Sequence, residues 1–186
     1  MKKSILLLVS LVCITTAFSQ NYTKPNGFAI HFILNDFPTA KEIRNNGIGE
    51  TINQKMWYKT RRMNAGIGVS YIKGLSEHVD FAGTLAGSFL KYPIPDRVSN
   101  SADQKLLLEG VVTLNLTLLP DNFFAVPYFT AGIGASQYDG FYSAILPIGV
   151  GLQFKLGPDV FFLLNSQYRI PVTSSAEYHL YHSFGM

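Results

Sequence analysis

The sequence predicts an all-β fold, an eight-stranded antiparallel up-and-down barrel that crosses a membrane. Three observations predict it: an alternating strand pattern, an apolar composition without a helical membrane span, and connections of alternating length. The pattern is clearest in residues 106–118, where every second residue is apolar or glycine and most of the others are polar. Because side chains of a strand point alternately to opposite faces, this segment has one apolar and one mostly polar face.

The length of this segment indicates a membrane strand. At about 3.3 Å per residue its thirteen residues reach about 43 Å. A tilt of about 40° leaves about 33 Å along the membrane normal, which is enough to cross the hydrocarbon core. Strands of ordinary globular sheets have about 5–6 residues.

The composition agrees with a barrel in lipid. Hydrophobic residues make up 47% of the chain and charged residues only 15%, below the roughly 25% that is usual for soluble domains. After residue 19, however, no apolar run approaches the length of a membrane helix. A closed barrel is the alternative that satisfies every backbone hydrogen-bonding group in lipid.

Residues 1–19 predict a signal peptide, and residues 20–186 the barrel domain. Lys2 and Lys3 form its positive region, residues 5–14 its apolar region, and Ala17 and Ser19 are the small residues before a cleavage at Gln20. Cleavage also removes the only cysteine of the chain, so the mature protein has neither disulfides nor a thiol nucleophile. Without the two lysines, 13 basic residues remain against 12 acidic ones. This near balance gives no indication of a nucleic-acid partner.

Eight segments share the alternation. The predicted strands are residues 27–35, 63–75, 79–92, 106–118, 124–136, 143–156, 160–170 and 178–186. Long connections (36–62, 93–103, 137–142 and 171–177) alternate with short turns (76–78, 120–122 and 157–159). Outer-membrane barrels keep short turns on the periplasmic side. The mature N-terminus is therefore expected in the periplasm and residues 36–62 outside the cell.

The signal peptide and the eight alternating strands resemble the small outer-membrane β-barrel family, that is, the OmpA-like transmembrane domain and the OmpX-like eight-stranded barrels. The resemblance covers residues 27–186. It implies a monomer in the cell outer membrane, placed there by the outer-membrane insertion machinery and surrounded by outer-membrane lipid and lipopolysaccharide. OmpA-like relatives continue into a peptidoglycan-binding domain. Here the sequence stops at Met186 without the usual terminal aromatic residue, so we expect either a shortened eighth strand or a natural protein that continues.

Charged residues on the predicted inward faces form a candidate polar plug. Asp80 and Lys155 are expected near the periplasmic end, and Glu109 and Arg169 nearer the outer end. Charges shielded from water need partners. We therefore predict that each level pairs an acid with a base across the lumen. The alternative is that these groups lie unpaired near solvent at the rims.

No catalytic, cofactor or metal site is predicted. Lipid A deacylase barrels place a His and a Ser two residues apart on one outward face, whereas His182 and Ser183 are adjacent and point to opposite faces. The histidines show no spacing typical of metal ligands. A candidate surface-binding loop, directed at anionic lipopolysaccharide, contains Lys55, Lys59, Arg61 and Arg62; a merely solvated loop is the alternative.

The sequence thus predicts an integral outer-membrane barrel with a structural, envelope-integrity or surface-binding role and without catalysis. Two further interpretations stay open. One is a small pore or a lipid-modifying membrane enzyme. The other is a soluble lipocalin-like barrel, which would turn its apolar faces inward around a ligand. Against the latter, the polar faces carry few charges for a water-exposed surface.

Overall fold

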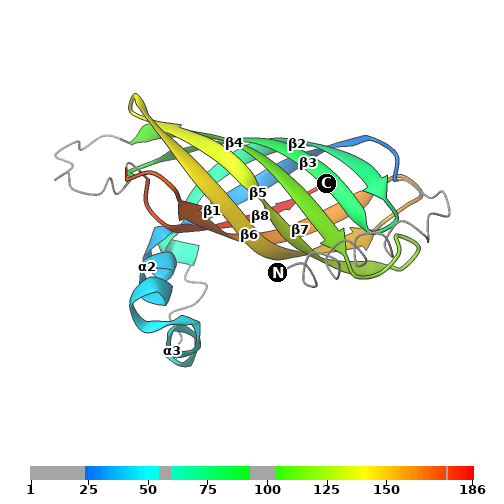
Figure 1. Cartoon of the computed structure of the whole chain (residues 1–186), viewed down its shortest axis with the longest axis horizontal. Coiled ribbons are helices and arrows are strands. Elements are labelled where there is room, and N and C mark those ends of the chain that lie inside the picture. The colour runs from blue at the N-terminus through cyan, green and yellow to red at the C-terminus, as the bar shows by residue number, and fades with distance from the viewer. Residues whose placement is uncertain (1–23, 55–59, 93–103, 175) are drawn as a thin grey trace, which may run out of the picture.

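The chain forms one closed antiparallel barrel of eight strands, each paired with the next and β8 paired with β1 (Figure 1). This computed structural model describes residues 24–54, 60–92, 104–174 and 176–186. The strands are β1 Gly27–Asp36, β2 Asn64–Ser76, β3 Val79–Leu90, β4 Lys105–Thr117, β5 Ala125–Tyr138, β6 Phe141–Lys155, β7 Phe161–Pro171 and β8 His179–Gly185. The predicted fold class and number of strands are confirmed.

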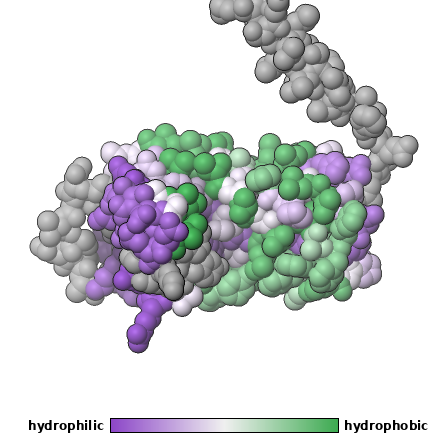
Figure 2. Space-filling model, turned by 90° about the horizontal axis from the view of Figure 1, so that it is seen from below, coloured by the Kyte–Doolittle hydropathy of each residue, from purple (hydrophilic) through white to green (hydrophobic). Residues whose placement is uncertain are grey.

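The apolar faces of the strands point outward, as predicted. Phe28, Ile30 and Leu114 are exposed, Leu114 by 52%, whereas His31 and Thr113, on the alternate faces, are buried. In Figure 2 apolar residues cover the side of the barrel, and polar residues gather near the helices and at the opposite end. A lipocalin-like barrel would have its apolar faces inside, so this alternative is wrong. Among the described residues, no helix has the length and apolar character needed to cross a membrane.

The two ends of the barrel differ. At one end, called here the short-turn end, residues 77–78, 118–124 and 156–160 join β2 to β3, β4 to β5 and β6 to β7. The opposite end, called the helix end, carries α2 (Phe37–Asn46), α3 (Ile48–Asn53) and a short 3-10 helix, Thr60–Arg62 (Figure 1). The sequence predicted only a polar connection there.

Local signals account for α2. The carboxylate of Asp36 accepts hydrogen bonds from the backbone N–H of Thr39 (2.9 Å) and from its hydroxyl (2.6 Å), which caps the helix N-terminus. Pro38 lies in the first turn, where a missing N–H costs nothing. Gly47 ends the helix with a φ of 81°, in the left-handed region. The helix packs against β8.

The connection between β5 and β6 corrects the sequence analysis. Residues 137–142 were expected to form a long loop, but the strands run on to Tyr138 and from Phe141. Only Asp139 and Gly140 lie between them, with φ values of 50° and 82°. Two positive φ angles define the type I′ hairpin turn, for which Asp-Gly is a favoured pair. The turn lies at the helix end, so not every connection at that end is long.

Candidate functional site in the barrel lumen

Three charged or ionisable side chains meet in the lumen toward the helix end. Glu109 of β4 forms an ion pair with Arg169 of β7, and the Nε2 of His179 of β8 lies 3.3 Å from a Glu109 carboxylate oxygen. All three side chains are almost completely buried. The sequence placed Glu109 and Arg169 at one level but missed His179. The pairing of β7 with β8 would have indicated His179, because this residue lies directly opposite Arg169 in the ladder.

Aromatic rings surround this cluster. The guanidinium of Arg169 lies 3.6 Å from the ring centre of Tyr181. Phe37, the first residue of α2, stacks on His179 at 4.9 Å and meets Tyr92 edge-on at 5.1 Å. Burial raises the pKa of Tyr92, so its hydroxyl stays protonated. The first turn of α2 thus contributes to closing the lumen at this end.

A second polar cluster closes the short-turn end. The ammonium of Lys24 lies 3.0 Å from a carboxylate oxygen of Asp80 and 3.7 Å from one of Asp121, and it donates a hydrogen bond to the side-chain carbonyl of Gln153. The Gln153 amide donates in turn to Asp121 at 2.8 Å. The Phe161 ring lies 4.8 Å from the ammonium. The lysine and both acids are buried.

Lys24 takes the place that the sequence analysis gave to Lys155. The alternation of side chains in β6 places Lys155 on the inner face, but this residue is the last of the strand and lies half-buried at the rim. There it lines a pocket with Glu77 and Asn122. Asp80 instead meets the lysine of the segment that precedes β1. The pattern of a strand cannot predict where a segment outside the strands will fold.

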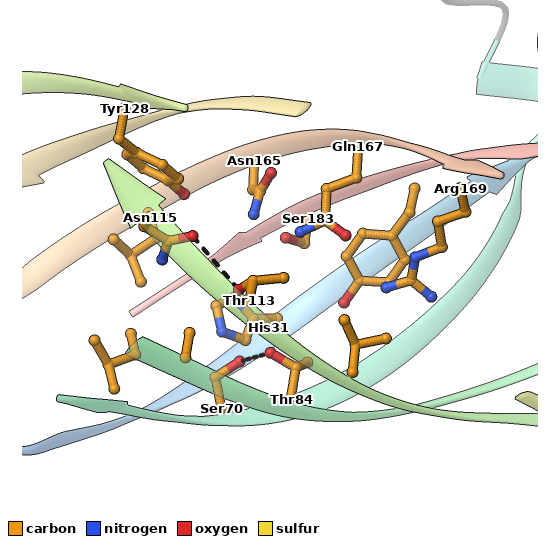
Figure 3. A pocket seen from close by; sticks show the side chains of 15 residues that line it. His31, Ser70, Thr84, Thr113, Asn115, Tyr128, Asn165, Gln167, Arg169 and Ser183 are labelled. Carbon is orange, nitrogen blue, oxygen red and sulfur yellow. Dashed lines mark hydrogen bonds between the residues drawn. The ribbon is translucent and has the colours of Figure 1, made fainter. Parts of the chain in front are cut away.

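Between the two clusters lies a cavity of about 30 Å³. Most of the residues that line it have polar side chains, among them Asn165 and Gln167 (Figure 3). The hydroxyls of Ser70 and Thr84 in its wall are hydrogen-bonded to one another at 2.7 Å. Both ring nitrogens of buried His31 and the side-chain oxygens of Asn165 and Gln167 lack a protein hydrogen-bond partner. Such groups are usually satisfied by water, and a cavity needs only about 10–15 Å³ to hold one molecule.

The histidines and serines of β8 lie on both faces of the strand. His179 and Ser183 line the lumen, whereas His182 lies on the opposite face of the strand, as the alternation predicted. The Nδ1 of His182 is 2.9 Å from the hydroxyl oxygen of Ser166 on β7. Ser166 lies within a strand that is paired on both sides, so the neighbouring N–H groups belong to the ladder and cannot form an oxyanion hole.

The candidate basic loop is described only in part. Arg61 and Arg62 belong to the 3-10 helix at the helix end and are exposed, while Lys55 and Lys59 lie outside the described residues. In the ranges that the structure describes, no three His, Cys, Asp or Glu side chains are grouped so that they could hold a metal ion.

No protein-family model matches the sequence, and no curated protein matches it. Solved structures do match. Neisserial surface protein A (NspA) is 11% identical, with a TM-score of 0.52 over 87% of this chain and 96% of its own. Ail, the attachment invasion locus protein of Yersinia pestis, was solved with the heparin analogue sucrose octasulfate; it is 15% identical, with a TM-score of 0.47 over 86% of this chain and 94% of its own.

The closed ring of eight antiparallel strands, apolar outside and polar inside, is the fold of the small outer-membrane β-barrels. The resemblance seen in the sequence is confirmed at the level of the fold. The particular likeness is to NspA, and it extends over nearly the whole length of both chains.

Proposed function

We propose that this protein is an integral outer-membrane barrel without catalytic activity, a closed scaffold in the envelope that presents its helix end at the cell surface for binding. The observation that carries the proposal is the combination of an apolar outer wall with a lumen closed by buried charged clusters at two levels. An apolar wall requires lipid around it. A lumen closed in this way is unsuited to a wide pore.

The orientation follows from the turns. Outer-membrane barrels place their short turns in the periplasm, so the helix end faces the exterior. Signal-peptide cleavage before Gln20 and insertion by the outer-membrane machinery belong to the same proposal. The name of NspA, a surface protein, agrees with a role at the cell surface.

The surface ligand we propose is anionic lipopolysaccharide. Arg61 and Arg62 are exposed on the 3-10 helix of the helix end, and Arg44 of α2 is exposed there too, with its guanidinium 3.6 Å from a Glu177 carboxylate oxygen. Arginine suits phosphate because its planar fork can donate two parallel hydrogen bonds. The barrel would be surrounded by this lipid in the outer leaflet, so binding requires no diffusing partner.

Two measurements test the closed scaffold. In planar bilayers the purified barrel should insert and show no large steady conductance, and porin-like steps would support the pore instead. Incubated with lipid A and phospholipid, the barrel should leave both intact. Release of fatty acid that was abolished in Ser166→Ala would establish a lipid-modifying enzyme.

A third measurement tests the surface ligand. Binding of lipopolysaccharide micelles should weaken in the Arg61→Ala/Arg62→Ala variant. Binding by this variant should also depend less on salt, because fewer cations pair with phosphate and salt screens such pairs. Lys155→Ala, at the short-turn end, is the matched control and should bind like the unaltered protein. Equal binding by both variants would show that the 3-10 helix does not take part in binding.

A further inference from the structure

The segment that precedes β1 enters the mouth of the barrel at the short-turn end. Residues 24–26 lie outside the strand ladder, and the ammonium of Lys24 contacts Asp80 and Asp121, which lie on β3 and in the β4–β5 turn. Gly74 of β2 leaves room for the backbone of this segment. A Cβ atom added at Gly74 would lie 2.6 Å from the Lys24 backbone nitrogen and 2.9 Å from its carbonyl oxygen. Position 74 on the inner face of β2 must therefore be glycine for the segment to approach so closely.

Two buried carboxylates require a cation at the position of the Lys24 ammonium. Asp80 and Asp121 are both buried and share the same ammonium. Without it, two carboxylates would stand close together with the Gln153 amide as their remaining neutral partner. Burying unpaired like charges is strongly unfavourable. Lys155 lines a rim pocket together with Asp121, but the ion pairs of Asp80 and Asp121 are with Lys24.

The inner face of β2 extends from Gly74 to the central cavity. Gly74 lies beneath Lys24, and Ser70 lines the central cavity with unpartnered His31. Between these positions, Ile72 lines both that cavity and a larger pocket of about 610 Å³ that Lys24 itself lines. Lys24 therefore lies between the outside of the barrel and a polar chamber that has room for water.

We propose that Lys24 is a displaceable stopper: it seals a water-holding chamber in the lumen from the short-turn end, while the Glu109–Arg169–His179 cluster seals the other end. The segment is held by side-chain contacts and not by the strand ladder, so it can leave without unzipping any strand. Displacement opens the chamber from one side only and creates no through-channel. This inference goes beyond the scaffold role and does not depend on what the helix end binds.

The first test measures the reactivity of lysine amines in the unaltered barrel. Acetylation by N-hydroxysuccinimide acetate, followed by mass spectrometry, gives a rate for each lysine. Lys24 should react at least about tenfold more slowly than Lys155 at the same rim, because a buried amine reacts only from a locally open state. In Asp80→Asn/Asp121→Asn this protection should disappear. Equal rates for Lys24 and Lys155 in the unaltered protein would overturn the proposal.

The second test measures access to the chamber. The mature chain has no cysteine, so Ser70→Cys provides a single near-isosteric thiol in the chamber wall. Its reaction with methanethiosulfonate ethylammonium should be about tenfold faster in a Lys24→Ala background, since the opening step is removed. Lys155→Ala is the matched control and should leave the rate unchanged. Equal rates in the two backgrounds would show that Lys24 seals nothing.

Folding is checked in every variant by the mobility shift between unheated and heated samples. If Lys24→Ala does not fold, the amine profile of the unaltered protein still decides the question. A steady conductance in folded Lys24→Ala would contradict the second seal at the helix end. Failure of lipopolysaccharide binding, in contrast, would affect only the proposed function.

Discussion

At the scale of single residues, the lumen depends on charges that satisfy one another. Glu109 is buried with Arg169 and His179 around it, and Asp80 is buried with Lys24. Each cluster joins side chains from segments far apart in the sequence: β4, β7 and β8 in one, and β3, the β4–β5 turn and the segment before β1 in the other. Such pairs contribute modestly to stability when intact, but removing one partner leaves an isolated charge in a region that cannot solvate it.

Glu109→Gln should therefore destabilise the barrel by about 3–5 kcal/mol, the usual cost of breaking a buried pair. Urea unfolding of the refolded barrel in detergent measures the free energy. Glu50→Gln, on an exposed turn of α3, is the control and should change it by less than about 0.5 kcal/mol.

Replacement of both partners separates the effect of an unpaired charge from that of altered packing. The Glu109→Leu/Arg169→Met variant should be closer in stability to the unaltered barrel than Glu109→Gln is, since no unpaired charge remains. A double variant less stable than the single one would mean that the pair itself supplies the stability.

At the scale of elements, close approach between strands determines which inner positions must be glycine. A Cβ atom at Gly149 of β6 would lie 2.2 Å from the Ser166 carbonyl oxygen and 2.7 Å from the Gln167 Cα of β7. Both neighbours are backbone atoms of a paired strand, so neither can move aside without disturbing the ladder. On the outer face the same residue type has no such constraint. At Gly83 of β3 an added Cβ would meet nothing nearer than a Phe81 ring atom at 3.8 Å.

Gly149→Ala is expected to cost at least the roughly 1–3 kcal/mol typical of overpacking, because the clash is with backbone. Gly83→Ala is the matched control and should be neutral or slightly stabilising, since alanine has less freedom to lose in the unfolded chain. Thermal denaturation followed by circular dichroism compares them. Equal destabilisation of the two would contradict the strand spacing described here.

The N-terminus of α2 permits an independent test at the same scale. Asp36→Ala removes the cap and should destabilise the barrel by about 0.5–2 kcal/mol. Asp36→Asn keeps a side-chain oxygen for the Thr39 N–H and should retain most of that stability. An Asn variant as unstable as the Ala variant would show that the charge matters more than the cap.

At the scale of the whole molecule, alternation along the sequence was enough to predict eight strands and to assign their faces. It succeeded because lipid outside and a packed lumen inside impose opposite demands on successive residues, as at Leu114 and Thr113. It failed where the chain leaves the strands. The helix in the polar stretch after Asp36 depends on a local cap, and the position of Lys24 depends on folding back into the mouth. The Asp139–Gly140 turn lies inside residues 137–142, which were interpreted as one loop although both strands continue into that stretch.

The outer wall gives the prediction for the molecule in its membrane. Leu114 is the tenth of the 13 residues of β4 and points outward. Leu114→Arg should destabilise the inserted barrel by up to about 2–4 kcal/mol, the cost of a cation at mid-bilayer on the lipid face, which falls toward the interfaces. Leu114→Met is the control, with a change below about 1.5 kcal/mol. Reversible unfolding from lipid vesicles gives both values, and a tolerated arginine would place this face away from the hydrocarbon.

The junction of β1 with β8 has a consequence for biogenesis. It joins His31 to Gly185, so the ring cannot form until β8 has been synthesised, long after β1. Pairing over so great a sequence separation has a large loop-closure entropy and is intrinsically slow. Until it happens, β1 and the growing sheet expose unpaired edges that invite association with other chains. The rate at which β8 pairs with β1 therefore sets how long these edges stay exposed.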